Sequence, residues 1–204
     1  MNMKLRPYKA EDSQTICSWV KDEKTLFQWS ADRIGKFPLT GNELNENYAE
    51  RKAGIDFFPL TAVDDKENVI GHLFVLIPDE NVKTTVRFGF VIVSPEIRGK
   101  GCGRKMLELG IEYAKKELKA SKATLGVFAN NPKAQACYEA VGFVPVSKRI
   151  VKILEADWEC IDMEMELKSP TLDAERRGIE PSARIKNAQG YGTPAKQPTA
   201  GNGG

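Results

Sequence analysis

The residues of this sequence best suited to chemistry form a short glycine-rich stretch, Arg98-Gly-Lys-Gly-Cys-Gly-Arg104. It follows an apolar run at 91–93 and precedes a segment with helical periodicity. Glycines at 99, 101 and 103 let backbone N–H groups approach a ligand, because no β-carbon stands in the way. A helix N-terminus adds unpaired N–H donors and about half a positive charge, which suits a phosphate. The stretch is therefore a candidate pyrophosphate-binding turn.

Spacing excludes two common phosphate-binding loops. A Walker A loop requires Gly-Lys-Ser/Thr at a fixed distance after an earlier glycine, and no glycine here is followed by that triplet. A dinucleotide fingerprint requires Gly-x-Gly-x-x-Gly, but the third glycine position holds Met106 in one register and Arg104 in the other. Taken alone, the stretch could equally be a plain turn whose charges face solvent.

A second motif follows at Asn131-Pro-Lys-Ala-Gln-Ala-Cys-Tyr138-Glu-Ala-Val-Gly142-Phe143. It matches Asn-x-x-Ala-x-x-x-Tyr-x-x-x-Gly-Phe, and the glycine stretch resembles Gln/Arg-x-x-Gly-x-Gly/Ala; both are hallmarks of the GNAT superfamily of N-acetyltransferases. The resemblance covers roughly residues 4–167. Within it, Gln28-Trp29-Ser30 and Phe37-Pro38-Leu39 look like the ribosomal-protein-acetyltransferase-like branch.

The resemblance implies a mixed α+β fold whose mostly antiparallel sheet is splayed at the acetyl-CoA site and flanked by helices. It implies an acetyl-CoA-dependent N-acetyltransferase, in which a primary amine of a small molecule or protein attacks the thioester directly. Asn131 would hold the pantetheine arm, and Tyr138 would protonate the leaving thiolate as the catalytic general acid. The other implied acetyl-CoA contacts are the strand residues Val91, Ile92 and Val93 and the turn residues Arg98, Gly99, Lys100, Gly101, Cys102, Gly103 and Arg104. No metal is expected.

The general base is not evident from the sequence. Some members of the family carry a glutamate five residues before the motif asparagine, and here that position is Gly126. The preceding strand offers no carboxylate, only Arg87 and Gly89. His72, the one histidine, is either a base or a buried core residue. We expect the amine to lose its proton through water, or to arrive partly neutral.

The acceptor side carries no motif. Trp29 and Phe37 either line the acceptor cleft or belong to the core. Asp162, Glu164 and Glu166 form either a solvated strand face or a site for a cationic acceptor. A protein N-terminus, an aminoglycoside, a polyamine and a small metabolite amine all stay open as acceptors, and the chain is expected to be a monomer or homodimer. A non-catalytic acyl-CoA-binding module is the alternative function.

Hydrophobic periodicity predicts the elements that position these residues. Strands are expected at 4–8, 57–63, 69–77, 86–93, 123–128, 148–154 and 161–167. Helices are expected at 11–20, 23–29, 40–51, from the glycine turn to about 118, and at 131–142. Thr40 and Asn131 suit N-caps, and Gly142 suits a helix end. The strand at 86–93 becomes apolar on both sides beyond Phe90, which predicts that its end is fully buried.

The composition indicates the domain limits and argues against several kinds of partner and metal site. The chain has 204 residues and a net charge of +2. Residues 169–204 hold five Lys/Arg and three Asp/Glu, which leaves 25 of each sign in 1–168. We expect an acetyltransferase domain at 1–168 and a disordered tail, rich in Pro and Gly, at 169–204. The even charge argues against nucleic-acid or membrane-surface partners, and a cytoplasmic protein is expected. Four dispersed cysteines and a single histidine argue against a zinc site.

Overall fold

The computed structural model describes residues 2–167, which fold around a seven-stranded sheet. The strands are β1 (Lys4–Pro7), β2 (Phe57–Val63), β3 (Val69–Leu76), β4 (Thr85–Val93), β5 (Lys122–Phe128), β6 (Val144–Ile153) and β7 (Ala156–Glu166). The helices are α1 (Asp12–Cys17), α2 (Glu23–Ser30), α3 (Gly41–Gly54), α4 (Cys102–Lys116) and α5 (Pro132–Val141), with a 3-10 turn, η1, at Pro95–Ile97. None of these helices has the length and apolar character of a membrane span. The predicted tail, 169–204, lies outside the described residues.

The sheet is antiparallel except at one pair of strands. Its order is β1-β2-β3-β4-β5-β7-β6, and β4 and β5 form the parallel pair. Their pairing is short, because it begins at Thr85 and stops at Arg87 opposite Thr124. Beyond that point β4 stays paired with β3, and β5 with β7, but the two strands no longer pair with each other. The predicted α+β fold with a splayed, mostly antiparallel sheet is confirmed.

A β-bulge in β4 lies beside the splay. Phe90 has a φ of 50°, in the left-handed region that aromatic residues rarely adopt, and the register with β3 shifts opposite it, between His72 and Phe74. The extra residue of a bulge reverses the face that later side chains occupy. Phe88 accordingly packs in one core and Phe90 in the other. Ile92 is buried in the second core, whereas Val91 and Val93 pack against the first core and are only half-buried. The predicted full burial therefore holds for one face of the strand end and not for the other.

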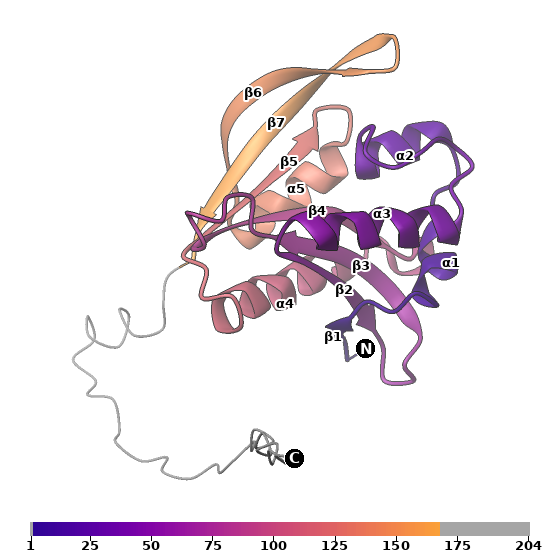
Figure 1. The fold of residues 1–204 in the computed structure, drawn as a ribbon, viewed down its shortest axis with the longest axis horizontal. Helices are drawn as coiled ribbons and strands as arrows, with labels where there is room; N and C mark the ends of the chain where they lie inside the picture. Colours follow the sequence, from indigo (N-terminus) through magenta and orange to yellow (C-terminus); the bar gives the residue numbers. More distant parts are fainter. Residues whose placement is uncertain (1, 168–204) are drawn as a thin grey trace, which may run out of the picture. The chain divides into compact units, whose positions relative to one another are not determined.

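Two hydrophobic cores cover the two faces of the sheet. One contains residues of α4 and α5, including Leu107 and Tyr138, and the other contains residues of α1, α2 and α3, including Trp29 and Leu44. The β6–β7 hairpin extends past the other strands, as Figure 1 shows. The site is therefore built on a sheet that is held from both sides, with a projecting hairpin at one end.

Local caps fix the helices as the sequence predicts. Thr40 and Glu43 form a capping box, in which the Thr40 N–H donates to Glu43 Oε2 (2.7 Å) and the Glu43 N–H donates to Thr40 Oγ1 (3.3 Å). Asn131 caps α5 by accepting from the Ala134 N–H (3.3 Å). Gly142 ends α5 with a φ of 109°, a value that a β-carbon would strain.

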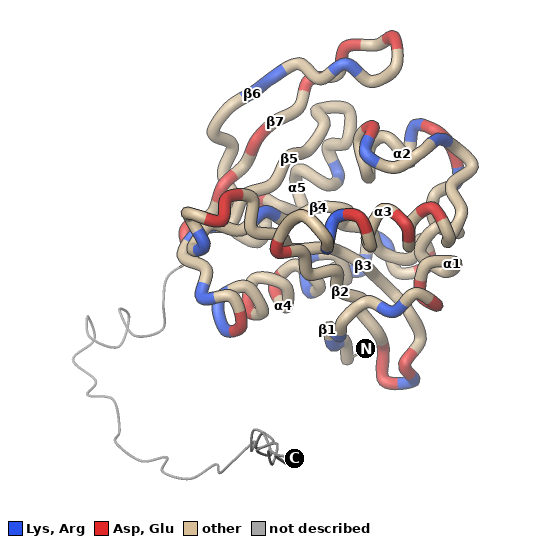
Figure 2. The backbone as a smooth tube through the Cα atoms, viewed as in Figure 1, with Lys and Arg blue, Asp and Glu red and all other residues tan. Residues whose placement is uncertain are grey.

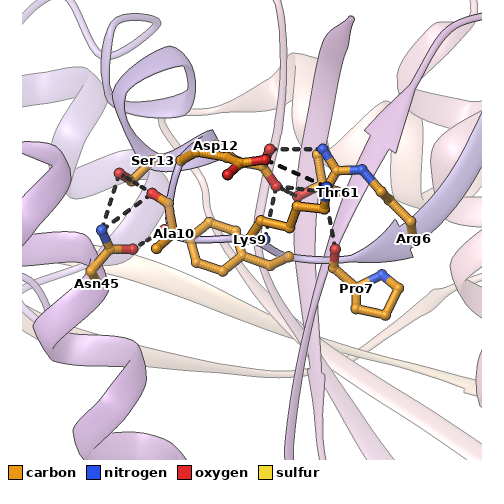
Figure 3. Close-up of polar contacts among 10 residues, drawn as sticks. Arg6, Pro7, Lys9, Ala10, Asp12, Ser13, Asn45 and Thr61 are labelled. Carbon is orange, nitrogen blue, oxygen red and sulfur yellow. Dashed lines mark hydrogen bonds and ion pairs between the residues drawn. The ribbon is translucent and has the colours of Figure 1, made fainter. Parts of the chain in front are cut away.

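One buried carboxylate ties β1, α1 and β2 together (Figure 3). Asp12 is 2% exposed and accepts hydrogen bonds from both Arg6 Nη atoms (2.7 Å each), the Lys9 N–H (2.9 Å) and the Thr61 hydroxyl (2.7 Å). Burial raises the pKa of Asp12, but these hydrogen bonds outweigh that effect and hold the pKa below its ordinary value.

Charged residues of both signs are interspersed along α2, α3 and α4 (Figure 2).

Candidate active site

The glycine turn between β4 and α4 has an open backbone. Gly99 and Gly101 have φ values of 74° and 77°, which a β-carbon would strain. A β-carbon at either position would have no atom within 4 Å, so the space beside the turn is open. Gly101 is the N-cap of α4, and no side chain caps this helix end. The first N–H groups of α4 are therefore available to an anion.

Three exposed cations surround this turn. Arg98 Nε donates to the Val93 carbonyl (3.2 Å), and Lys100 Nζ donates to the Glu96 carbonyl (3.0 Å). Arg104 pairs at 3.0 Å with a carboxylate one turn further along α4. Glu96 lies exposed on the loop, and only its backbone takes part in these contacts. The cations add positive potential to the N-terminus of α4.

At the N-cap of α5, the two polar atoms of the Asn131 side chain differ in their contacts. Its side-chain oxygen caps the helix, while its amide nitrogen makes no hydrogen bond to the described residues. The nitrogen is thus a donor that a bound molecule can use.

Tyr138 combines burial with a hydroxyl that keeps some contact with solvent. It is 8% exposed, and its ring packs edge-on against Phe143. Burial raises the pKa of Tyr138, so its phenol stays protonated at neutral pH. Among the described residues, the polar side-chain atoms that lack both solvent access and a hydrogen bond are Trp29 Nε1 and His72 Nδ1. The Tyr138 oxygen, which also lacks a hydrogen bond in this part of the chain, therefore retains solvent access.

The structure brings most of the predicted coenzyme contacts together. A β-carbon on Gly103 would lie 3.5 Å from Sγ of Cys137, the neighbour of Tyr138, so the glycine turn approaches α5 directly. Three further predicted residues pack against the core that contains Tyr138: Val91, Val93 and Cys102. Ile92 differs, because its side chain is buried in the core of α1–α3 and only its backbone can face this site.

On the other face of the sheet, a cavity of about 110 Å³ lies where β4 and β5 separate. Its walls come from α2 and the segment that follows it, from β4 and β5, and from the β6–β7 hairpin. The lining side chains with polar or ionisable groups include Trp29, Asp32, Arg33, Arg87, Arg149 and Cys160.

An arginine occupies the place expected of a base. A β-carbon on Gly126 would lie 2.9 Å from Arg87 Nη2. Arg87 lies 3.6 Å from Asp162 Oδ1, and Arg149 Nε donates to Asp162 Oδ2 at 2.9 Å. Burial lowers the pKa of Arg87, Asp162 partly offsets this, and Arg33 and Arg149 lower it further. The guanidinium is nevertheless charged at neutral pH.

His72 belongs to the core and not to the site. It is fully buried, and its Nε2 lies 2.6 Å from the Tyr48 hydroxyl. Burial lowers the pKa of His72 to about 3, so the ring is neutral at physiological pH. A group that binds protons so weakly cannot serve as a base for an amine.

The remaining predictions for the acceptor side have different outcomes. Trp29 lines the cavity, whereas Phe37 lies outside its lining and is 37% exposed. Asp162 is taken by two arginines, and Glu164 pairs with a lysine of β5. Glu166 is exposed. This row of carboxylates is thus largely engaged with cations of the protein itself.

Sequence reasoning did not single out Arg33 and Arg149. Arg149 stands opposite Cys160 in the β6–β7 register, as Gly126 stands opposite Asp162 in the β5–β7 register. These pairings bring the residues together, but a register with a shift near Pro145 cannot be read from alternation alone. In residues 2–167 no group of three or more His, Cys, Asp or Glu could hold a metal ion.

Open N–H donors at a helix N-terminus, a splayed sheet and a cavity beside the splay together form the arrangement expected of an acetyltransferase site. The chain belongs to the acetyltransferase (GNAT) family, whose family model matches residues 14–143. It is an acetyl-CoA-dependent N-acetyltransferase.

Two curated relatives share part of this sequence. A spermidine N(1)-acetyltransferase of Vibrio cholerae is 36% identical over 144 residues, 69% of this chain and 78% of that protein. A UPF0039 protein of Schizosaccharomyces pombe is 32% identical over 117 residues, 52% of this chain and 73% of that protein.

Solved structures share the fold. The crystal structure of spermidine N-acetyltransferase from Vibrio cholerae in complex with CoA and spermine has a TM-score of 0.68 at 22% identity, covering 81% of this chain and 95% of that one. A dodecameric structure of spermidine N-acetyltransferase from the same organism has a TM-score of 0.61 at 22% identity, covering 81% and 94%.

Proposed function

We propose that this enzyme binds acetyl-CoA along the glycine turn and α5, and transfers the acetyl group through the β4–β5 splay to a primary amine in the cavity beside α2. The observation that carries the proposal is the splay itself. It separates two strands between the open glycine turn and the cavity. Each substrate then approaches from its own side, and the reacting atoms meet where strand pairing is missing.

The coenzyme contacts follow from the open groups. Residues 99–104 would take the pyrophosphate on backbone N–H groups, helped by the charges of Arg98, Lys100 and Arg104. Val91 and Val93 would offer backbone groups to pantetheine, and Ile92 would contribute only its backbone. The amide nitrogen of Asn131 would donate to the same arm. Cys102 would line the helix end rather than react.

The chemistry then needs one proton donor and one group of oxyanion donors. The amine nitrogen attacks the thioester carbon, the C–N bond forms and the C–S bond breaks. Nitrogen loses a proton and sulfur gains one. Tyr138 would deliver the proton to sulfur and regain one through solvent, and unpaired N–H groups of β4 would stabilise the carbonyl oxygen.

The relatives and the cavity point to different classes of acceptor amine. The Vibrio cholerae relatives are named for spermidine, which makes a polyamine one candidate. The arginines that line the cavity disfavour such a polycation, since like charges repel. The ribosomal-protein-acetyltransferase-like branch is the further candidate, supported by Trp29 in the cavity wall but not by Phe37.

The proposal also includes the oligomeric state of the enzyme and the end of its catalytic domain. We expect a monomer or homodimer, with the dodecameric relative as the alternative that light scattering would detect. A chain that ends at residue 168 should bind acetyl-CoA as the full chain does.

The test is thiol release from acetyl-CoA, measured with a panel of amines and checked by mass spectrometry of the products. Transfer to any amine supports the enzyme. Tight acetyl-CoA binding without transfer to any amine would leave a non-catalytic acyl-CoA-binding module.

A further inference from the structure

The cavity beside the splay holds more guanidinium than carboxylate charge. Arg33, Arg87 and Arg149 line it, and Asp32 is the carboxylate among the described lining residues. Asp162 lies next to the lining and is shared by Arg87 and Arg149. The Arg33 side chain makes no hydrogen bond or ion pair within residues 2–167. Its donors are open to a bound molecule.

A fourth guanidinium lies directly behind the cavity wall. Arg51 stands 5.7 Å and 5.3 Å from the ring centroids of Phe74 and Phe90, which both line the cavity. Its Nε donates to Asn47 Oδ1 (2.7 Å), and no carboxylate lies within 4 Å of it in the described part of the chain. Burial lowers the pKa of Arg51, and the charge of Arg33 lowers it further. The positive potential thus extends beyond the lining residues.

Trp29 contributes its ring surface, and not its N–H, to the cavity. Trp29 is 9% exposed and lines the cavity, and its Nε1–H has neither solvent access nor a partner among the described residues. A group that water cannot reach is also closed to a ligand oxygen. The donors that this cavity offers a ligand are therefore those of its arginines.

We propose that the acceptor is a small primary amine that carries a carboxylate, which the cavity binds through Arg33 and Arg149. This rests on the acetyl transfer proposed above. The cavity of about 110 Å³ has room for a small amino-carboxylate.

The same charges account for the missing base. Arg87 fills the space beside Gly126, where some family members carry a glutamate. A positive potential disfavours the protonated form of an amine placed in it, so the bound acceptor loses its proton more readily. The carboxylate fixes the acceptor, and the remaining positive charge keeps its amine reactive. No protein carboxylate is then required to accept the proton.

The experiment compares matched acceptors in the thiol-release assay with the full chain. Glycine, β-alanine and 4-aminobutyrate are set against their primary amides and against spermidine. We expect at least one carboxylate to exceed its amide by roughly tenfold or more in kcat/KM, the effect of one charge-assisted hydrogen bond. The amide's amine is less basic, so amine ionisation would produce the opposite order.

Arginine variants tie that preference to the cavity. Arg33→Gln and, separately, Arg149→Gln should each reduce the carboxylate-over-amide ratio by roughly tenfold. Lys152→Gln is the matched control, because Lys152 lies exposed on β6 beside the lining residue Val151 and outside the lining itself. It should leave the ratio unchanged.

Each alternative outcome has a distinct meaning. If spermidine or the amides are the better acceptors, or if both arginine variants keep the carboxylate-over-amide ratio of the wild type, the carboxylate proposal is overturned while acetyl transfer stands. If no amine is acetylated although calorimetry shows acetyl-CoA binding, the proposed function itself is overturned, and this inference with it.

Discussion

The guanidinium of Arg87 occupies the space that a side chain at position 126 would need. A β-carbon on Gly126 would lie 2.9 Å from Arg87 Nη2 and 3.2 Å from Cys160 Sγ. Gly126 therefore does more than leave this position without a base. Because it has no side chain, the guanidinium of Arg87 can line the cavity at this point. Where a glutamate on β5 would place a negative charge, Arg87 of β4 places a positive one.

Gly126→Ala tests this relationship. The added methyl group must displace Arg87, which can swing its flexible end, so the free energy of unfolding should fall by about 1 kcal/mol or less. The acceptor KM should rise roughly 3- to 10-fold, because the displaced guanidinium reshapes the cavity. Gly54→Ala is the control, since a β-carbon there meets nothing within 4 Å. An unchanged KM in a variant of normal melting temperature would show that Arg87 has no part in the cavity.

Gly103→Asp separates coenzyme binding from folding. Gly103 lies in the first turn of α4, where a carboxylate stabilises a helix by about 0.3–1 kcal/mol. The same carboxylate would repel the pyrophosphate, so acetyl-CoA affinity should fall roughly 100-fold or more while the fold is kept. Calorimetry measures the affinity, and Gly103→Ala, which adds bulk without charge, should lose less. Equal affinity in the folded Asp variant would remove the glycine turn from the site.

The local structure on the proposed coenzyme side was predictable from the sequence because it depends on neighbouring residues. Open glycines, an uncapped helix end and the Asn131 cap all follow from residues close together in the chain. The acceptor side depends on pairings between distant segments. The bulge at Phe90 and the β6–β7 register decide which side chains meet, and neither leaves a clear periodic signal. The sequence therefore predicted a missing carboxylate at position 126 but not the arginine beside it.

His72 predicts a loss of stability in mild acid. Its pKa in the folded state is about 3, while an unfolded chain binds a proton near pH 6.5. The unfolded state therefore takes up the proton first, and the stabilisation is complete above pH 6.5 and declines as pH falls toward 3. Between pH 8 and pH 5 this group should cost about 2 kcal/mol of unfolding free energy.

Urea unfolding at several pH values measures the effect. In His72→Gln, which keeps a polar side chain near the Tyr48 hydroxyl, the decline between pH 8 and pH 5 should largely disappear, although the variant starts from lower stability. A wild-type stability that is flat across this range would mean that the ring is protonated within the fold, contrary to its burial.

Tyr138→Phe distinguishes a working enzyme from a binding module. The change removes one hydroxyl from a ring that otherwise packs against Phe143 as before, so stability and acetyl-CoA affinity should barely change. Turnover should fall by roughly 10² to 10⁴, the usual effect of losing a general acid. The loss should shrink with acyl donors whose thiol has a lower pKa, because such thiolates leave with less help. Single-turnover kinetics with a confirmed acceptor would measure both effects. Wild-type turnover in the variant would mean that solvent or another group delivers the proton, and that Tyr138 serves only the core.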